Sequence, residues 1–469
     1  MSHFGQLLGE RCFTLNDQLR FSQFSGDRNP IHLNPQKARK TLAGECIVHG
    51  VNVYLWALER LVSEINEIPK QYKIKFHGQI GLDKKIYCYW SQKKKSLSIL
   101  GGHDELMVSI ECEGYVKDNL ASVDLTVKTQ KQLDVPNKTK SNYLSDDTNF
   151  ESVCGGEISL GKQLFCLLSK RLGSYLLYEI AVLSNIVGMQ IPGNRSIFVS
   201  CNLNFRKEKN TPHYKVIGFD KRFGKVDLKY EGRNIDATME TFIRPKSLSV
   251  DTCIEIREKL SKVDVLGGRK SLILGGSRGI GAWVAKIIGC LGGNVTISYL
   301  MGDSEATAIC RDINDNTSSY SKAQRFDVNK DDFKEFFNEK YEDLFYFPTP
   351  KIFGKKSSVF EQDRYQMFYG IYCTAFERIA EDFFHNGGSN IFYPSSIAVE
   401  EDAIELQEYK KAKQFGENIC RKIEQSLHLR VIVERLERVH TDQTLNILQA
   451  PALDPFDVAL KIVKKMYNL

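Results

Sequence analysis

In the second half of the chain, an apolar run leads directly into a glycine-rich turn and a second apolar run: LILGGSRGIGAWVAKIIG, residues 272–289. A short apolar strand, a tight turn and a helix in this order form the repeating unit of a sheet with parallel strands. The chain continues to alternate strand-like and helical stretches after this point. The sequence therefore predicts an α/β domain with a parallel sheet over residues 268–469.

The part of the chain before this domain contains the same order of helix and strands twice. Residues 1–135 contain a helical apolar run, HGVNVYLWALERLVSE, followed by strand-like stretches, and residues 150–245 contain another apolar helix followed by strands. One long helix followed by several antiparallel strands, present twice, indicates a structural duplication. Residues 134–157 are polar and rich in turn formers, and we interpret them as a linker between the two copies.

The composition limits the kinds of partner. A chain of 469 residues, 42% hydrophobic and 26% charged, is an ordinary globular chain with more than one domain. Its net charge of +6 is too small to indicate nucleic-acid binding, but it suits anionic ligands such as nucleotides or acidic carrier proteins. The 12 cysteines show neither metal-ligand nor disulfide spacing, which favours reduced thiols and a cytoplasmic location.

Neither a signal peptide nor a membrane span is expected. The N-terminus lacks the basic region and apolar stretch that a signal peptide needs. The most apolar stretch, residues 173–193, is interrupted by Glu179 and Asn185, so we predict a buried helix there.

A cluster of chemically active residues occurs near the N-terminus, in FSGDRNPIHLNP, residues 24–35. The glycine, asparagine and proline of this stretch would by themselves make an ordinary surface turn. Asp27 and His32, however, lie five residues apart across the turn, so a carboxylate and an imidazole can reach one water and exchange protons with it. Asn29 is then expected to fix the loop or to orient His32.

This stretch resembles the (R)-specific enoyl-CoA hydratases and dehydratases of the MaoC-like family, which have the hot-dog fold. A second family feature, a His-Gly pair that opens the central helix, is present as His49 and Gly50. The resemblance implies that Asp27 and His32 are catalytic, and that Asn29 and Gly50 bind substrate. The backbone N–H of Gly50 would receive the thioester oxygen, while His49 is expected to cap or pack at the helix start.

The resemblance also implies an α+β double hot-dog domain. Its first half would carry the catalytic motif, and its second half, which lacks the motif, would shape the acyl pocket. An α/β Rossmann-like domain would follow it in the chain.

The glycine-rich turn resembles that of the short-chain dehydrogenases/reductases. A glycine-rich turn alone is weak evidence, but here it joins a strand to a helix N-terminus, as a pyrophosphate site requires. Tyr409 and Lys413 form a Tyr-x-x-x-Lys motif, and Ser396 precedes the tyrosine by thirteen residues, the spacing of that family. The cofactor-binding residues implied by the resemblance are Gly275, Ser277, Arg278, Gly279, Ile280, Gly281, Asp327 and Lys413.

The same resemblance makes Ser396, Tyr409 and Lys413 the catalytic residues of a reductase. The i, i+4 spacing puts Tyr409 and Lys413 on one helix face. We expect the Lys413 ammonium to lower the pKa of Tyr409, so that the phenol gives a proton to a carbonyl oxygen receiving hydride. Ser396 would hydrogen-bond that oxygen, and Lys413 would also hold the nicotinamide ribose.

The turn also bears on the choice of cofactor. Arg278 lies in the glycine turn, and no carboxylate ends the second strand, NVTISYLMG. An acid at that place would contact a free ribose hydroxyl and repel a phosphate, so its absence favours NADP(H) over NAD. Asp327 matches the aspartate that contacts adenine in the family.

Three departures from the reductase pattern leave the activity of this domain open. The usual Asn-Asn-Ala-Gly is replaced by FYFPTP at 345–350, the helix asparagine by Tyr372, and the Pro-Gly after the sixth strand by Leu436-Glu437. Cofactor binding survives such changes more easily than turnover does.

Together the two resemblances predict a bifunctional enzyme of acyl-thioester metabolism. Its reductase would convert a 3-oxoacyl thioester of CoA or a carrier protein to the (3R)-hydroxyacyl thioester, and its hydratase would interconvert that product with the trans-2-enoyl thioester. One alternative is a hydratase whose second domain only binds nucleotide. Another is a non-catalytic acyl-thioester or nucleotide-binding module of a larger assembly. A homo-oligomer is expected by resemblance.

Overall fold

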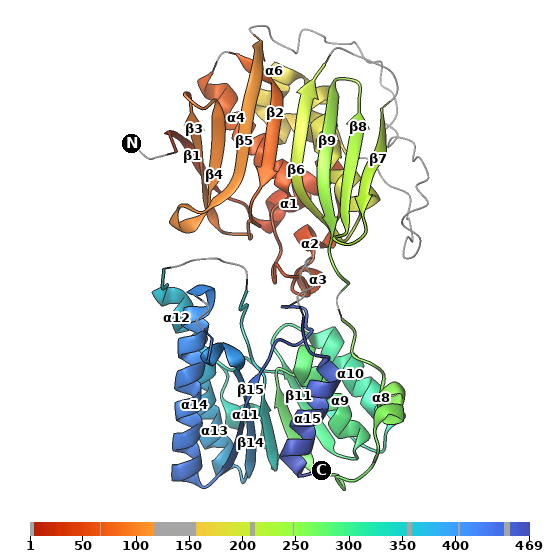
Figure 1. Ribbon diagram of the computed structural model, residues 1–469, viewed down its shortest axis with the longest axis vertical. Helices are drawn as coiled ribbons and strands as arrows, with labels where there is room; N and C mark the ends of the chain where they lie inside the picture. The colour runs from red at the N-terminus through yellow and green to blue at the C-terminus, as the bar shows by residue number, and fades with distance from the viewer. Residues whose placement is uncertain are drawn as a thin grey trace. The chain divides into compact units, whose positions relative to one another are not determined.

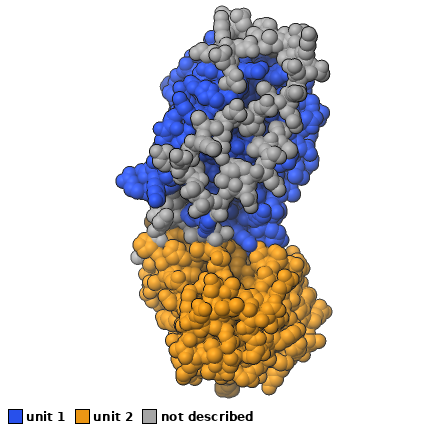
Figure 2. Space-filling model, turned by 90° about the vertical axis from the view of Figure 1, so that its right-hand side faces the viewer, with its two compact units in different colours: residues 1–246, 446–448 blue, residues 247–445, 449–469 orange. Residues whose placement is uncertain are grey.

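The computed structural model describes residues 4–65, 67–116, 156–206, 212–246, 248–353, 359–401, 404–444 and 451–469. These residues fall into two compact units, one within residues 4–246 and one within 248–469, which Figure 2 colours separately. The linker predicted at 134–157 lies outside the described residues except for its last two positions.

Unit 1 contains one nine-stranded antiparallel sheet of order β1-β3-β4-β5-β2-β6-β9-β8-β7 (Figure 1). The order β3-β4-β5-β2 of the first half recurs as β7-β8-β9-β6 in the second, and β1 is added at one edge. The halves meet where β2 pairs antiparallel with β6, with Ile74 opposite Cys201. The strands are β1 (Gln6–Cys12), β2 (Ile68–Phe76), β3 (Lys85–Ser91), β4 (Ser96–Leu100), β5 (Leu106–Val116), β6 (Ser196–Phe205), β7 (His213–Asp220), β8 (Lys225–Glu231) and β9 (Ile235–Ile243).

Each half places one long helix against this sheet, α4 (Gly50–Glu64) in the first and α7 (Ser174–Asn185) in the second. Most of α4 is buried because its sequence is apolar nearly all round. Helix α7, which lies in the stretch predicted to be a buried helix, continues into a π-helical turn, Ile186–Gln190. The shorter helices are α1 (Leu15–Ser25), α2 (Pro30–Leu33), α3 (Pro35–Ala38), α5 (Leu160–Leu164) and α6 (Cys166–Leu172), with a 3₁₀ turn at Gly102–Asp104.

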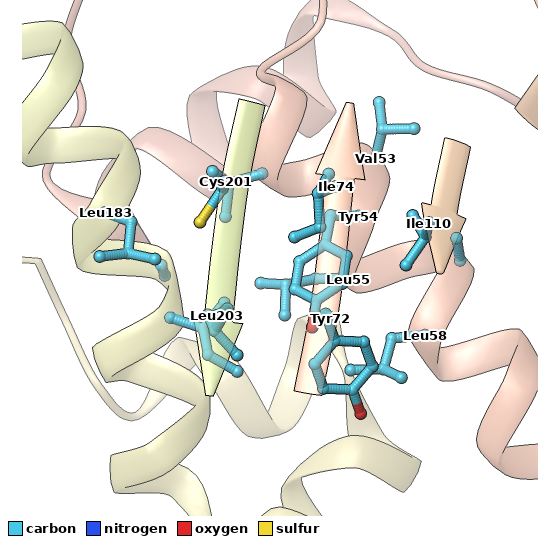
Figure 3. Close-up of a cluster of buried hydrophobic side chains, with 14 of the residues drawn as sticks. Val53, Tyr54, Leu55, Leu58, Tyr72, Ile74, Ile110, Leu183, Cys201 and Leu203 are labelled. Atoms are coloured by element: carbon cyan, nitrogen blue, oxygen red, sulfur yellow. The ribbon is translucent and has the colours of Figure 1, made fainter. Parts of the chain in front are cut away.

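The core of unit 1 crosses the boundary between its halves, as Figure 3 shows. Tyr54 and Leu58 on α4 pack with Tyr72 on β2, and with Leu183 and Leu203 from the second half. Each fully buried leucine of this kind contributes about 1.5–3 kcal/mol relative to exposure. Because the cluster draws on both halves, neither half buries its own apolar face alone.

Among the described residues, no single helix is long and apolar enough to cross a membrane. The helices Cys166–Leu172 and Ser174–Gln190 reach the required length and composition only as a pair, and they are bent by 115°.

Unit 2 contains a six-stranded parallel sheet of order β12-β11-β10-β13-β14-β15. Counted from β10, this is the order 3-2-1-4-5-6 of a doubly wound dinucleotide-binding fold. The parallel sheet and Rossmann-like fold predicted for this part of the chain are therefore confirmed. The strands are β10 (Lys270–Leu274), β11 (Asn294–Tyr299), β12 (Ser321–Arg325), β13 (Asp343–Tyr346), β14 (Asn390–Ser396) and β15 (Arg430–Leu436).

Helices cover both faces of this sheet. Ile273 belongs to one hydrophobic cluster and its neighbours Leu272 and Leu274 to another, so the two clusters lie on opposite faces. Helices α8, α9, α10 and α15 pack together in the first cluster, and α12, α13 and α14 in the second. The helices are α8 (Cys253–Lys259), α9 (Gly279–Cys290), α10 (Asp303–Asn316), α11 (Phe333–Phe336), α12 (Gln362–Tyr369), α13 (Phe376–His385), α14 (Gln407–Leu427) and α15 (Pro455–Tyr467), with a π-helical turn at Gly370–Ala375.

A buried carboxylate supports the connection between α4 and the second half of unit 1. Glu59 on α4 accepts the N–H groups of Leu167 and Leu168, both at 2.9 Å, at the start of α6. These first-turn donors have no partner within their own helix. Glu59→Ala should lower the free energy of unfolding by about 2–3 kcal/mol, because hydrogen bonds to a charged group are lost.

Denaturant unfolding of the full chain, followed through the transition of unit 1, measures this change. The control is Glu64→Ala, which alters an exposed glutamate of the same helix and should change the free energy by less than about 0.5 kcal/mol. Equal effects of the two substitutions would contradict a structural role for Glu59.

Candidate active sites

The loop that follows α1 is shaped by its own side chains. Gly26 ends α1 in the left-handed conformation, at φ 78°, which glycine adopts without strain. Oδ1 of Asp27 accepts the N–H of Asn29 at 3.0 Å. Oδ1 of Asn29 in turn accepts the N–H of Ile31 at 3.2 Å and caps the short helix α2. Asn29 therefore fixes the loop, and its Nδ2 donates to the carbonyl of Gly188 at 3.4 Å.

Asp27 is 2% exposed and is contacted by the second half of unit 1. Ser184 on α7 donates its hydroxyl to Oδ2 at 2.6 Å, and a Cβ placed on Gly188 would lie 2.4 Å from Oδ1. Burial raises the pKa of Asp27, while His32 and the hydrogen bonds from Ser184 and Asn29 act in the opposite direction. The carboxyl group is thus in an environment that favours uptake of a proton.

His32 lies on α2 and has one ring nitrogen without a hydrogen. Its Nδ1 is 2.8 Å from the carbonyl oxygen of Ile47, which can only accept, so Nδ1 carries the hydrogen and Nε2 keeps a lone pair. Burial lowers the pKa of His32, and Asp27 opposes that effect. A neutral imidazole next to a carboxyl group can take a proton from a bound molecule and return it.

His49 immediately precedes α4, and its side chain does not cap the helix. Its ring stacks on that of His32, with 3.8 Å between the centroids, and its Nε2 lies 3.2 Å from the carbonyl oxygen of Asp27. Of the two roles expected for His49 at the helix start, capping or packing, the structure shows packing, because the ring turns toward the loop that holds Asp27. Gly50 begins α4, and no acceptor for its N–H is found in the described part of the chain.

Sequence reasoning missed the residues that the second half contributes. Ser184 and Gly188 occur in the apolar stretch 173–193, where a small polar residue and a glycine interrupt an otherwise continuous apolar helix. That interruption is a usable signal, but only the fold brings these positions to Asp27, more than 150 residues away in the chain.

The ligand atoms of Asp27, His32 and His49 lie within 4.8 Å of one another, a spacing that also suits a metal ion. However, both ring nitrogens of His49 and Nδ1 of His32 already face hydrogen-bond partners. Only Asp27 and Nε2 of His32 remain as ligands, which is fewer than the three protein ligands typical of a catalytic zinc site. The cluster suits proton transfer better than metal binding.

In unit 2 the glycine-rich turn forms a tight cradle at the N-terminus of α9. Gly275 has φ 76°, and a Cβ there would lie 2.9 Å from the backbone of Phe347. A Cβ on Gly281 would lie 2.7 Å from the carbonyl oxygen of Gly275. The turn therefore needs glycine at both positions, and it leaves helix N–H groups facing outward, as a pyrophosphate group requires. Gly279 and Ile280 are the first residues of α9, directly after Ser277 and Arg278.

The structure brings Ser396, Tyr409 and Lys413 together. Ser396 ends β14 and is hydrogen-bonded to Tyr409, which lies on α14 one turn before Lys413. Nζ of Lys413 is 5.9 Å from the centre of the Tyr409 ring. It donates to the carbonyl oxygen of Pro394 at 2.6 Å and lies 3.8 Å from the centre of the Tyr372 ring.

The expected effect of Lys413 on Tyr409 is wrong. Burial raises the pKa of Tyr409 to about 12, and only the hydrogen bond from Ser396 opposes it. Burial also lowers the pKa of Lys413 to about 7, so this lysine is a weak source of positive charge at neutral pH. Tyr372, in the position of the family asparagine, covers the ammonium with its ring.

The other predicted nucleotide contacts are less distinctive. Arg278 has an acid partner in the same unit, with Nη1 3.8 Å from Oδ2 of Asp442. Asp327 follows β12, and its Oδ1 accepts the N–H of Asn329 at 3.1 Å. Tyr299, which ends β11, donates its hydroxyl to Asp303 at 2.5 Å, so a carboxylate does lie near the end of the second strand.

Residues 9–95 match the family model of the MaoC like domain. This stretch includes Asp27, His32, His49 and Gly50, and it is less than half of the chain. No curated protein matches the chain significantly.

Similar solved structures include an alcohol dehydrogenase from the archaeon Thermococcus sibiricus, complexed with 5-hydroxy-NADP, at 16% identity. The match covers 43% of this chain and 91% of that chain, with a TM-score of 0.38. A short chain dehydrogenase from Burkholderia cenocepacia J2315 in complex with NADP is 17% identical and covers 42% and 90%, with a TM-score of 0.39. Because these identities and TM-scores are low, the description of unit 2 is drawn from its own strand order and residues.

The burial of Asp27 predicts that its carboxyl group reduces stability. An acid whose pKa is raised by folding destabilises the folded state as the pH rises from its ordinary value, 3.8, through the raised value. Asp27→Asn removes the charge: its Oδ1 still accepts the N–H of Asn29, and its Nδ2 donates to the Ser184 hydroxyl, which then accepts. The variant should therefore be more stable than the wild type at pH 7, and the difference should shrink toward pH 4.

Thermal unfolding between pH 4 and pH 7 measures this difference. Asp83→Asn, at an exposed position of the same unit, is the control and should leave the pH dependence unchanged. An Asp27→Asn variant less stable than the wild type at pH 7 would mean that the carboxylate stabilises the fold.

Proposed function

We propose that this chain is an acyl-thioester enzyme with two activities. Unit 1 hydrates trans-2-enoyl thioesters and dehydrates (3R)-hydroxyacyl thioesters, and unit 2 reduces 3-oxoacyl thioesters with NADPH. The observation that carries the proposal is the buried cluster in which the carboxyl group of Asp27 and the free Nε2 of His32 lie together near the start of α4. The match of residues 9–95 to the MaoC like domain supports it.

Hydration by unit 1 uses three groups. Nε2 of His32 takes a proton from water as the water oxygen bonds to C3 of the enoyl group. The electron pair of the double bond moves toward the thioester carbonyl, whose oxygen is received by the N–H of Gly50. The proton held by the pair of His32 and Asp27 then passes to C2, and dehydration is the reverse.

Two arginines near the site favour an anionic carrier such as CoA or a phosphopantetheine-bearing protein. The N–H of Arg244 donates to the carbonyl of Arg195 at 2.7 Å, and its guanidinium contacts the carbonyls of Asn194 and Ser196. Burial, together with the charge of Arg195, lowers the pKa of Arg244 to about 10. Neither arginine has a carboxylate partner among the described residues. The positive charge of Arg244 contributes to lowering the pKa of His32.

Hydration of crotonyl-CoA by the full chain tests the first activity. His32→Ala should lower kcat by about 10²–10⁴-fold, the usual contribution of a general acid–base group. Gly188→Ala should also lower kcat, because the added methyl group displaces the Asp27 carboxylate.

Gly102→Ala is the matched control, since a Cβ there meets nothing within 4 Å. Full activity in His32→Ala and Asp27→Asn would contradict catalysis by this cluster. A wild-type protein that binds acyl thioesters without hydrating or reducing them would favour a non-catalytic binding module over either enzyme function.

Reduction by unit 2 depends on Ser396 and Tyr409. NADPH, when bound in the glycine cradle at Gly275 and Gly281, supplies the hydride for a 3-oxo group. Ser396 hydrogen-bonds the 3-oxo oxygen, and Tyr409 donates the proton that the oxygen gains. Arg278, next to the cradle, favours the 2′-phosphate of NADP over NAD.

A second candidate is a hydratase whose unit 2 binds nucleotide without turnover. The specific observation in its favour is the position of Lys413, which donates to Pro394 and is covered by Tyr372. A lysine held in this way is less available to hold a ribose or to lower the pKa of Tyr409.

Oxidation of NADPH in the presence of a short 3-oxoacyl-CoA separates the two candidates. If unit 2 is a reductase, Tyr409→Phe should lose about 10²-fold or more in this reaction while hydration of crotonyl-CoA stays unchanged. Tyr341→Phe removes another buried hydroxyl of unit 2, one bonded to Thr296, and serves as the control. A wild-type protein that binds NADPH without oxidising it would establish the second candidate.

A further inference from the structure

The ring of His49 is fully buried, and both of its nitrogens face oxygen atoms. Nδ1 lies 2.8 Å from Oε1 of Gln18, on α1, and Nε2 lies 3.2 Å from the carbonyl oxygen of Asp27. The ring also stacks on His32. One side chain therefore contacts α1, the catalytic loop and the second catalytic residue.

The backbone fixes which atoms donate in these contacts. The N–H of His49 donates to the same Gln18 atom at 3.0 Å, so this atom must be the amide oxygen and Nδ1 must donate to it. The carbonyl oxygen of Asp27 also can only accept, so the contact at 3.2 Å is a hydrogen bond when Nε2 carries a proton. Because a neutral imidazole has one N–H, the Nδ1 bond to Gln18 and the Nε2 bond to Asp27 form together only when the ring is protonated.

The charge state of His49 decides which of these contacts is a hydrogen bond. Its Nε2 lies 3.9 Å from Oδ2 of Asp27, while burial and the neighbouring His32 lower the pKa of His49. The ring is therefore neutral and holds its one proton on Nδ1, where Gln18 accepts it.

We propose that His49 is a positioning residue of the hydratase site. Through its hydrogen bond to Gln18 and its stacking on His32, the ring ties α1 and the catalytic loop to the start of α4. Asp27, His32 and the N–H of Gly50, the residue after His49, then keep one arrangement. This inference rests on the hydratase function proposed for unit 1.

Three substitutions at position 49 separate the contacts. His49→Phe keeps an aromatic ring and loses the hydrogen bond to Gln18. His49→Asn retains a donor close to Gln18, whereas His49→Gln moves the donor toward the carbonyl of Asp27. Gln18→Leu removes the Gln18 contact without changing the histidine.

Hydration of crotonyl-CoA is measured as kcat and KM across a pH range for each full-length variant. His49→Phe should lower kcat by about 10²-fold, the effect expected from misplacing catalytic groups by about 1 Å, with little change in KM. His49→Asn should recover part of this loss, and Gln18→Leu should show a smaller loss of the same kind.

The split between kcat and KM and the rescue by a conservative variant give readouts that a purely structural role would not move. A loss of kcat in His49→Phe at nearly constant KM, recovered in part by the donor of His49→Asn, follows the hydrogen bond to Gln18. Thr241→Val, which removes a buried hydroxyl bonded to the carbonyl of Val226 in the same unit, should lower stability without this pattern.

The outcomes distinguish the two proposals. A wild-type protein that hydrates no enoyl thioester overturns the hydratase function and this inference with it. An active wild type with unchanged kcat in His49→Phe overturns this inference alone. If His49→Phe does not fold, full activity in both His49→Gln and Gln18→Leu has the same meaning.

Discussion

The hydrogen bond from Ser184 to Asp27 joins the two halves of unit 1 at the point where the candidate chemistry occurs. It exists because β2 and β6 pair at the centre of one sheet and bring α7 next to the loop that follows α1. The same approach places Gly188 against the carboxyl group. The burial that makes Asp27 a good proton acceptor is therefore produced jointly by the two halves of unit 1. Neither half encloses the carboxyl group alone.

In unit 2, by contrast, packing makes a recognisable sequence motif less suited to its expected chemistry. The spacing of Ser396, Tyr409 and Lys413 is that of a reductase, and the fold does bring the three together. Tyr372 and Tyr393, however, place aromatic rings next to Lys413. The ring centres lie 3.8 and 4.9 Å from Nζ, respectively. A lysine surrounded in this way loses solvation and much of its influence on its neighbours. The nucleotide cradle at Gly275 and Gly281 does not depend on that lysine.

Local sequence patterns were sufficient to predict those parts of the structure that depend on residues close together in the chain. The alternation of strands and helices after residue 268 predicted a parallel sheet, and the glycine-rich turn does begin a helix at Gly279. The loop around Asp27 and Asn29 could likewise be recognised, because its hydrogen bonds are made within five residues. The roles of Ser184 and His49 could not be predicted, since they depend on contacts between segments that only the complete sheet brings together. The pKa of Tyr409 was predicted in the wrong direction because burial, which the sequence does not reveal, outweighs the nearby lysine.

The close contact of Gly188 with Asp27 makes the two halves of unit 1 unequal. Two copies of the first half would contain two loops of the Asp27 kind, but no counterpart of Ser184 or Gly188 to enclose either carboxyl group. Two copies of the second half would contain the enclosing surface and no counterpart of Asp27 or His32. The duplicated halves have thus become different in kind. The half without Asp27 and His32 sets how much space these two groups have.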